Sequence, residues 1–133
     1  MHRTMRRSLA LVLALAGLVP HLAGAGEVIA HPSVSLDADE IRDVFLGEKQ
    51  FSGRVRLMPV DNSSAQAEFL SKVLQSDERK YAARWTRKSF REGLAAPVVK
   101  GSDAEVIAFV RATPGAVGYV KGSAPELKVI EKF

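Results

Sequence analysis

The sequence predicts an α/β fold in which a small mixed or parallel sheet is flanked by helices. Two observations lead to this prediction. Short apolar runs that are typical of strands alternate with longer segments whose apolar residues recur at helical spacing. Proline and glycine mark the junctions, since Pro32 ends the first run and Pro114-Gly115 separates a helical segment from the run "AVGYV".

Residues 1–25 predict a secretory signal peptide that is not part of the fold. Three arginines precede a short, unbroken apolar run that ends at Pro20, and Ala23-Gly24-Ala25 supplies the small residues that a signal peptidase reads. The run is shorter than a transmembrane helix requires. We therefore expect a periplasmic or secreted protein, with residues 26–133 as a single domain and no stable membrane span after cleavage.

The first half of this domain predicts strand, helix, strand and helix in that order. "EVIAHP" (27–32) has the character of a short strand, and "LDADEIRDVFLG" (36–47) that of a helix. "VRLMPV" (55–60) is the next expected strand, and an amphipathic helix follows it. Ser63 and Gln66 have the spacing of a capping box at the start of that helix.

The second half predicts two helices and two strands. The first helix is expected at about 77–90, and the segments "EKQFSGR" and "REGLAAP" are the expected loops. The next helix, "SDAEVIAFVRA", opens with Ser102 and Glu105, which again have capping-box spacing. "AVGYV" and "LKVI" complete the domain as strands.

Gly118 lies inside the run "AVGYV" rather than at its end. A glycine within a strand often marks a bulge, or a close approach by another backbone or a ligand. Tyr119 follows it and adds a polar tip to an apolar body. Two interpretations stay open, namely a core strand packed tightly against a helix and a strand beside a ligand.

The residues after the predicted signal peptide offer little for catalysis or metal binding. The chain has no cysteine, and His31 is the one histidine that follows residue 25. One histidine cannot form the clusters that transition metals require, and no G-x-S-x-G motif accompanies it. Because the acidic residues are scattered rather than paired, we expect no enzyme, no metal site and no cofactor.

The basic character of the chain is concentrated in its first residues. Residues 1–25 hold three of the 19 basic residues and none of the 15 acidic ones, which leaves the rest with a net charge of +1. Within the rest, Lys80, Arg84, Arg87 and Arg91 share one helical stripe. A solvated helix face explains this stripe most simply, and a nucleic-acid partner is not expected.

Several segments of the domain resemble one known family in their order and spacing. They are "VIAHPSVS", "LDADEIRDVFLGEKQF", "VRLMPVD", "AEFLSKVL", "YAARWTRKSF" and "SDAEVIAFVRATPGAVGYV". Together they resemble the substrate-binding proteins of phosphate ABC transporters, and most closely the short PstS-like members. The resemblance runs from Val28 to Val120, and its most specific parts are "VFLG" and "PGAVGYV".

This resemblance implies an extracytoplasmic α/β domain that closes around an oxyanion. Full-length members have two lobes joined by crossing strands, as in type II periplasmic binding proteins. The present chain is far shorter, so it resembles one lobe plus the hinge strands. The implied partner is the permease of an ABC transporter, and pairing of two copies to rebuild a cleft stays open.

The larger phosphate binders hold the anion with a Ser-Gly-Thr at a helix start, often followed by an arginine. The matching positions are Ser63, Ser64, Ala65 and Gln66, of which Ser63 alone is retained. Independently of the family, a helix start leaves N–H groups without partners and carries the positive end of the dipole. Asn62 and the two serines could complete a cradle there, whereas in the simpler interpretation Ser63 only caps the helix.

The candidate ligand-binding residues are therefore Asn62, Ser63, Ser64, Ala65 and Gln66 at the helix start, together with Gly118 and Tyr119. We expect reversible capture of phosphate or a similar oxyanion. One alternative is an interaction or assembly module that keeps the lobe but binds no ligand, which the altered Ser-Gly-Thr positions favour. The other is a binder of nucleic acid or another polyanion through the stripe from Lys80 to Arg91.

Overall fold

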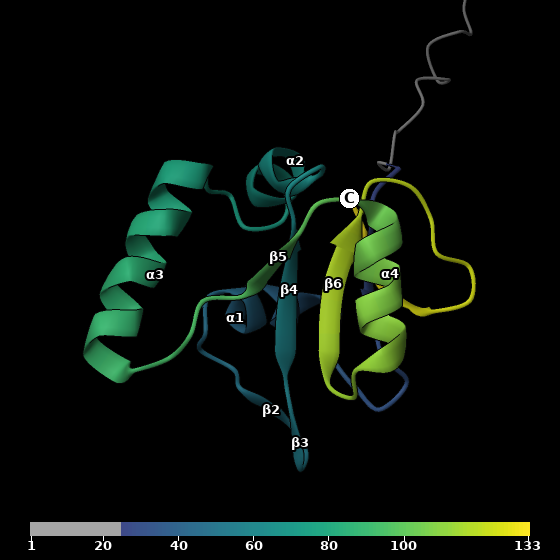
Figure 1. Ribbon diagram of the computed structural model, residues 1–133, viewed down its shortest axis with the longest axis horizontal. Coiled ribbons are helices and arrows are strands. Elements are labelled where there is room, and N and C mark those ends of the chain that lie inside the picture. Colours follow the sequence, from purple (N-terminus) through teal and green to yellow (C-terminus); the bar gives the residue numbers. More distant parts are fainter. Residues whose placement is uncertain (1–24) are drawn as a thin grey trace, which may run out of the picture.

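Five strands pair into a mixed sheet within residues 25–133, the part of the chain that the computed structural model describes (Figure 1). They are β1 (Glu27–Ala30), β4 (Met58–Asn62), β5 (Val98–Lys100), β6 (Ala116–Val120) and β7 (Lys128–Lys132). Their order is β5-β4-β6-β1-β7, with β4 parallel to β5 and β6, and β1 antiparallel to β6 and β7. The predicted α/β fold with a mixed sheet is thus confirmed.

The predicted signal peptide falls almost entirely on residues 1–24, which lie outside the described residues. Export therefore stays a prediction. Between residues 25 and 133, no helix is both long enough and apolar enough to cross a membrane.

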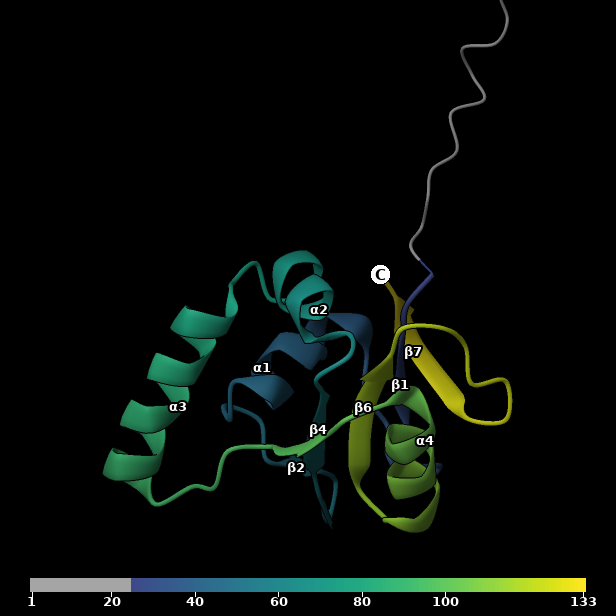
Figure 2. The same cartoon turned by 45° about the horizontal axis from the view of Figure 1, so that its top comes forward.

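Helices cover both faces of this sheet. They are the 3₁₀ helix η2 (Ala38–Glu40), α1 (Ile41–Phe45), α2 (Gln66–Lys72), α3 (Glu78–Glu92) and α4 (Asp103–Ala112). Helix α4 lies against one face, whereas α1 and α2 lie against the other, with α3 on the outer side of α1 and α2 (Figures 1 and 2). Two crossover connections, one through α2 and α3 and one through α4, join the parallel strands.

The two faces have cores of different composition. The core under α4 is built from small and branched aliphatic side chains, including Ile29, Val60 and Val106. The core under α1, α2 and α3 is aromatic, and the rings of Phe69 and Tyr119 stack with their centroids 3.8 Å apart. Since side chains alternate across a strand, β6 contributes to both cores.

Two glycines in the segments that carry the family resemblance are positions of close approach. A Cβ on Gly118 would lie 2.7 Å from Val60 and 2.8 Å from Val106, so the glycine lets α4 and β4 pack directly on β6. A Cβ on Gly47 would lie 2.7 Å from Trp85, and its φ of +76° also favours glycine. Of the two interpretations of Gly118, the structure therefore shows the core strand packed tightly against a helix.

The structure departs from the expected elements in two places. The predicted strand 55–60 is divided at Leu57, because β3 (Val55–Arg56) pairs with β2 (Phe51–Ser52) in a hairpin and β4 begins one residue later. The predicted loop "EKQFSGR" contains β2, and the predicted loop "REGLAAP" leads into β5. Neither of these very short strands was expected from the sequence.

Candidate functional site

The carboxyl ends of β5, β4 and β6 lie at one edge of the sheet, where α2 and α4 also begin. In open α/β sheets, ligands bind outside the carboxyl ends of the strands. Asn62 is the last residue of β4, in the strand that lies between β5 and β6. The sequence-predicted residues 62–66 therefore lie at the edge where a ligand is expected.

The side chain of Asn62 organises this edge through its own hydrogen bonds. Its amide nitrogen donates to Asp103 Oδ1 at 2.9 Å and to the carbonyl oxygen of Tyr119 at 3.0 Å. Its amide oxygen accepts from the N–H of Ser64 at 3.0 Å and from the hydroxyl of Ser64 at 2.6 Å. Asn62 and Ser64 thus shape the loop with groups that could otherwise contact a ligand.

Asp103 joins the start of α4 to the chain that leaves β6. Its Oδ1 accepts from the N–H of Lys121 at 2.8 Å, and its Oδ2 from the N–H of Gly122 at 3.0 Å. Partial burial opposes ionisation, but these two N–H groups and the amide of Asn62 hold the pKa of Asp103 below its usual value. The negative charge at this edge is therefore already matched by donors from the protein.

The two helices that begin at this edge differ in their caps. Ser102 caps α4, because its hydroxyl accepts from the N–H of Glu105 at 3.2 Å. Helix α2 has Ala65 at its N-cap and no side-chain cap. The capping pair that the sequence predicts between Ser63 and Gln66 does not form, since the helix begins only at Gln66.

Ser63 is the exposed hydroxyl beside this uncapped start. Its N–H donates to the carbonyl oxygen of Lys100 at 2.8 Å, which fixes its backbone between β4 and β5. Its hydroxyl makes no hydrogen bond with any residue between 25 and 133. Gln66, on the first turn of α2, lines an open groove of about 670 Å³ that runs along α3.

A buried carboxylate lies on the opposite face of the same strand. Asp61 accepts from the hydroxyl of Tyr119 at 2.8 Å and from that of Tyr81 at 2.9 Å. Burial raises the pKa of Asp61 to about 6, and the two hydroxyl donors limit this rise. This cluster was missed in the sequence, because its three members are far apart along the chain and form no local pattern.

The remaining predicted residues lie in the interior of the fold. Gly118 and Tyr119 are both buried in β6, and the Tyr119 hydroxyl is engaged by Asp61 rather than directed at the strand ends. The structure therefore brings residues 62–66 together at the carboxyl end of β4, but only Ser63 and Ser64 are exposed there, and Asn62, Ala65, Gly118 and Tyr119 are buried. Among the described residues, no three carboxylate or histidine side chains gather in a way that could hold a metal ion.

The basic stripe of α3 is exposed but partly neutralised. Arg84 forms an ion pair with Glu48 at 3.2 Å, and Lys80 lies 4.0 Å from Asp77. Arg87 and Arg91 are exposed and have no ion pair within residues 25–133. Tyr81 and Trp85 are buried on the inner side of the helix, whereas Phe90, between Arg87 and Arg91 along the chain, is 90% exposed.

Comparison with known proteins shows what this arrangement is similar to. No family model matches the chain, and no curated protein matches it. Among solved structures, the crystal structure of PstS from Borrelia burgdorferi has a TM-score of 0.52 at 15% identity, over 72% of this chain and 40% of that chain. The fold is PstS-like.

A second solved structure has a similar but weaker match. It is an ABC-type phosphate transport receptor from Vibrio cholerae, with a TM-score of 0.49 at 11% identity over 80% of this chain and 45% of that chain. The present chain thus spans less than half the length of either structure. The PstS-like fold described here corresponds to a part of such a protein.

Proposed function

We propose that this chain is an extracytoplasmic binding protein that captures phosphate or a similar oxyanion at the start of α2. The observation that carries the proposal is the pair of exposed serines, Ser63 and Ser64, beside the uncapped start of α2 at the carboxyl end of β4. The PstS-like fold and the segments that resemble phosphate-binding proteins support it. Its action is binding and release, without a chemical step.

The donors at this loop suit an anion. The first turn of a helix leaves backbone N–H groups without partners, and these point out of the N-terminus together with the positive end of the dipole. No side chain occupies this position in α2, and the Ser63 hydroxyl is free to donate. The carboxylate of Asp61 is directed into the core, and that of Asp103 accepts from backbone N–H groups of the protein. Neither carboxylate therefore occupies the position proposed for the anion.

The length of the chain adds a requirement to this proposal. Phosphate-binding proteins of the resembled family close two lobes around the anion, whereas this chain corresponds to less than half of the solved PstS. We therefore propose that a second molecule supplies the other wall, either a second copy of this chain or the permease of an ABC transporter. Binding by the isolated chain is accordingly expected at millimolar rather than micromolar concentration.

Calorimetric titration of residues 26–133 with phosphate, sulfate and chloride tests the proposal. Saturable binding of phosphate, weaker for chloride, is expected. Ser63→Ala should weaken phosphate binding by about ten- to a hundredfold, because it removes a charge-assisted hydrogen bond. Ser71→Ala, at an exposed serine farther along α2, is the matched control and should bind as the unmutated protein does.

A second candidate function has its own supporting observation. The side chains of Asn62 and Ser64 are used within the loop, and Ala65 lacks the threonine hydroxyl of the resembled motif. This favours an interaction or assembly module that keeps the lobe without its ligand. Absence of phosphate and sulfate binding at millimolar concentration would reject the first function in favour of this one. If phosphate does bind, equal affinity of Ser63→Ala and the unmutated protein would reject the proposed site.

A further inference from the structure

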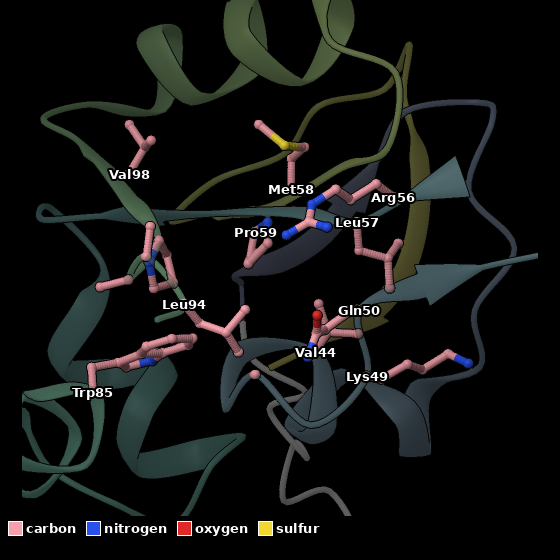
Figure 3. A pocket seen from close by; sticks show the side chains of 14 residues that line it. Val44, Lys49, Gln50, Arg56, Leu57, Met58, Pro59, Trp85, Leu94 and Val98 are labelled. Carbon is pink, nitrogen blue, oxygen red and sulfur yellow. The ribbon is translucent and has the colours of Figure 1, made fainter. Parts of the chain in front are cut away.

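A second candidate binding site lies at the other end of β4 from the α2 start. A cavity of about 260 Å³ is enclosed by Met58 and Pro59 at the amino end of β4, by the segment from Leu94 to Val98, and by Val44 of α1 (Figure 3). Trp85 of α3 closes its inner side. Because Met58 and Asn62 are the two ends of one strand, this cavity is separate from the oxyanion loop.

The wall of this cavity is mostly apolar and is partly open to solvent. Leu57 and Val44 are buried in its lining, whereas the side chains of Met58 and Val98, which are 38% and 45% exposed, are directed to the other side of β4 from Trp85 and Leu94 (Figure 3). Burial of exposed apolar surface by a ligand is favourable in proportion to the area removed from water. Apolar side chains grouped around a cavity are typical of a ligand site, unlike apolar residues scattered singly over a surface.

The charges at the rim are of one sign. Lys49 and Arg56 line the cavity, and no lining residue is acidic. Lys49 is paired with Glu40 at 3.3 Å and points away from the cavity, whereas the guanidinium of Arg56 extends back over it toward Pro59 (Figure 3). Within residues 25–133, Arg56 forms no ion pair, and its guanidinium carbon lies 5.8 Å from the centre of the Phe51 ring.

We propose that this cavity binds a small amphiphilic carboxylate. The apolar tail would lie between Trp85, Leu94 and Pro59, and the carboxylate would pair with Arg56, whose planar guanidinium suits a bidentate contact. Drug-sized ligands occupy pockets of roughly 300–1,000 Å³, so a cavity of about 260 Å³ suits a medium-length alkyl chain or a single ring. The site does not depend on oxyanion binding at α2.

The protein carries its own reporter for this test. Trp85 is the only tryptophan of the chain, and its indole N–H donates to the carbonyl oxygen of Phe45 at 3.0 Å, which fixes the ring beside the cavity. Titration with octanoate should shift the tryptophan emission saturably at millimolar concentration. Octylammonium, with the same tail and the opposite charge, and acetate, with the same charge and no tail, should bind at least tenfold more weakly.

Three variants assign the binding to this cavity. Arg56→Gln should weaken octanoate binding about tenfold, whereas Arg54→Gln, at an exposed arginine of the same hairpin, should leave it unchanged. Ala95→Phe, in an exposed position of the lining, should fill the cavity and abolish binding. Thermal melting of each variant checks that the fold is intact.

Failure of this site is distinguishable from failure of the oxyanion loop. Phosphate should neither compete with octanoate nor be affected by Ala95→Phe. No saturable response to octanoate, equal affinity for octylammonium, or an unchanged affinity in Arg56→Gln would each overturn the proposal. Displacement of octanoate by millimolar phosphate would also overturn it, because it would show that one site binds both.

Discussion

The two faces of the central sheet have opposite characters. The face under α4 is filled by aliphatic side chains, and Gly118 leaves room for Val60, Val106 and Val110 to pack directly on β6. The face under α1, α2 and α3 holds stacked aromatic rings, the buried carboxylate of Asp61, and both the groove and the cavity described above. The first face is filled by aliphatic packing, whereas the second also holds two hollows and a carboxyl group whose pKa is raised by burial.

This difference indicates a division of roles within a small domain. Tight packing of α4 fixes β4 and β6, and with them the loop that starts at Asn62. The other face holds the larger buried core, which includes Phe45, Phe69 and Leu70, together with Asp61 and the lining of the cavity. Substitutions in either core should therefore reduce stability, whereas Asp61 and the cavity lining should in addition control pH dependence and binding.

The largest expected effect is that of Gly118→Val on the α4 face. The new Cβ would lie 2.7 Å from Val60 and 2.8 Å from Val106, and the branched methyl groups would crowd these side chains further. Overpacking of a core costs about 1–3 kcal/mol and sometimes more, and we expect at least about 3 kcal/mol by urea unfolding. Gly122→Val is the control, since a Cβ there lies 3.6 Å from its nearest neighbour. Equal stabilities of the two variants would remove the contrast between the faces.

On the opposite face, Asp61 is expected to make stability depend on pH. Its pKa rises from 3.8 to about 6 in the folded protein, so between these values the folded state holds a proton that the unfolded chain has lost. The free energy of unfolding should therefore decrease as the pH rises through this window, by about 3 kcal/mol in total.

Substitution of this carboxyl isolates its contribution. Asp61→Asn should remove the decrease, so the stability difference between variant and unmutated protein should change by about 2 kcal/mol between pH 4 and pH 7. Urea unfolding over this pH range measures it, with Asp39→Asn at an exposed position as the control. A difference that stays constant with pH would show that burial does not shift the Asp61 pKa.

The smallest expected effect separates the starts of α4 and α2. Ser102→Ala removes the cap of α4 and should cost about 1 kcal/mol. Ser63→Ala removes no cap, so its cost should stay within about 0.5 kcal/mol, as for other surface substitutions. Thermal unfolding of both variants measures the difference. If Ser63→Ala proved as costly as Ser102→Ala, Ser63 would cap α2 after all, and its hydroxyl would not be free for an anion.

Local sequence patterns predicted the helices well, because helical periodicity is a local property. The segment expected at 77–90 is α3, Glu78–Glu92. Of the predicted capping box, Ser102 accepts from the N–H of Glu105, whereas the Glu105 side chain accepts from the Ser102 hydroxyl and the N–H of Gly101 instead of the N–H of Ser102. The strand β5 was missed because it has only three residues and its two valines are exposed. It is a strand only because β4 lies beside it, and no local pattern records that pairing.

The sequence predicted the place of residues 62–66 in the fold, but it did not predict the contacts among them. Residues 62–66 do lie at the carboxyl edge of the sheet, as the helix that follows them indicated. The capping pair of Ser63 and Gln66 was wrong because the Asn62 side chain takes the N–H and hydroxyl of Ser64 and holds the loop outside the helix. Such contacts depend on how β4 meets β6 and α4, which spacing alone does not reveal.

The pairing of β1 with β7 has a mechanical consequence. Gly26 and Phe133 exchange two backbone hydrogen bonds, of 3.0 and 2.8 Å, so the last residue of the chain lies beside the start of β1. A force applied at these two residues would act along the hydrogen bonds of an antiparallel pair and load them one after another, because those bonds lie perpendicular to the strands. Force spectroscopy with handles at these positions should show β7 peeling away at low load.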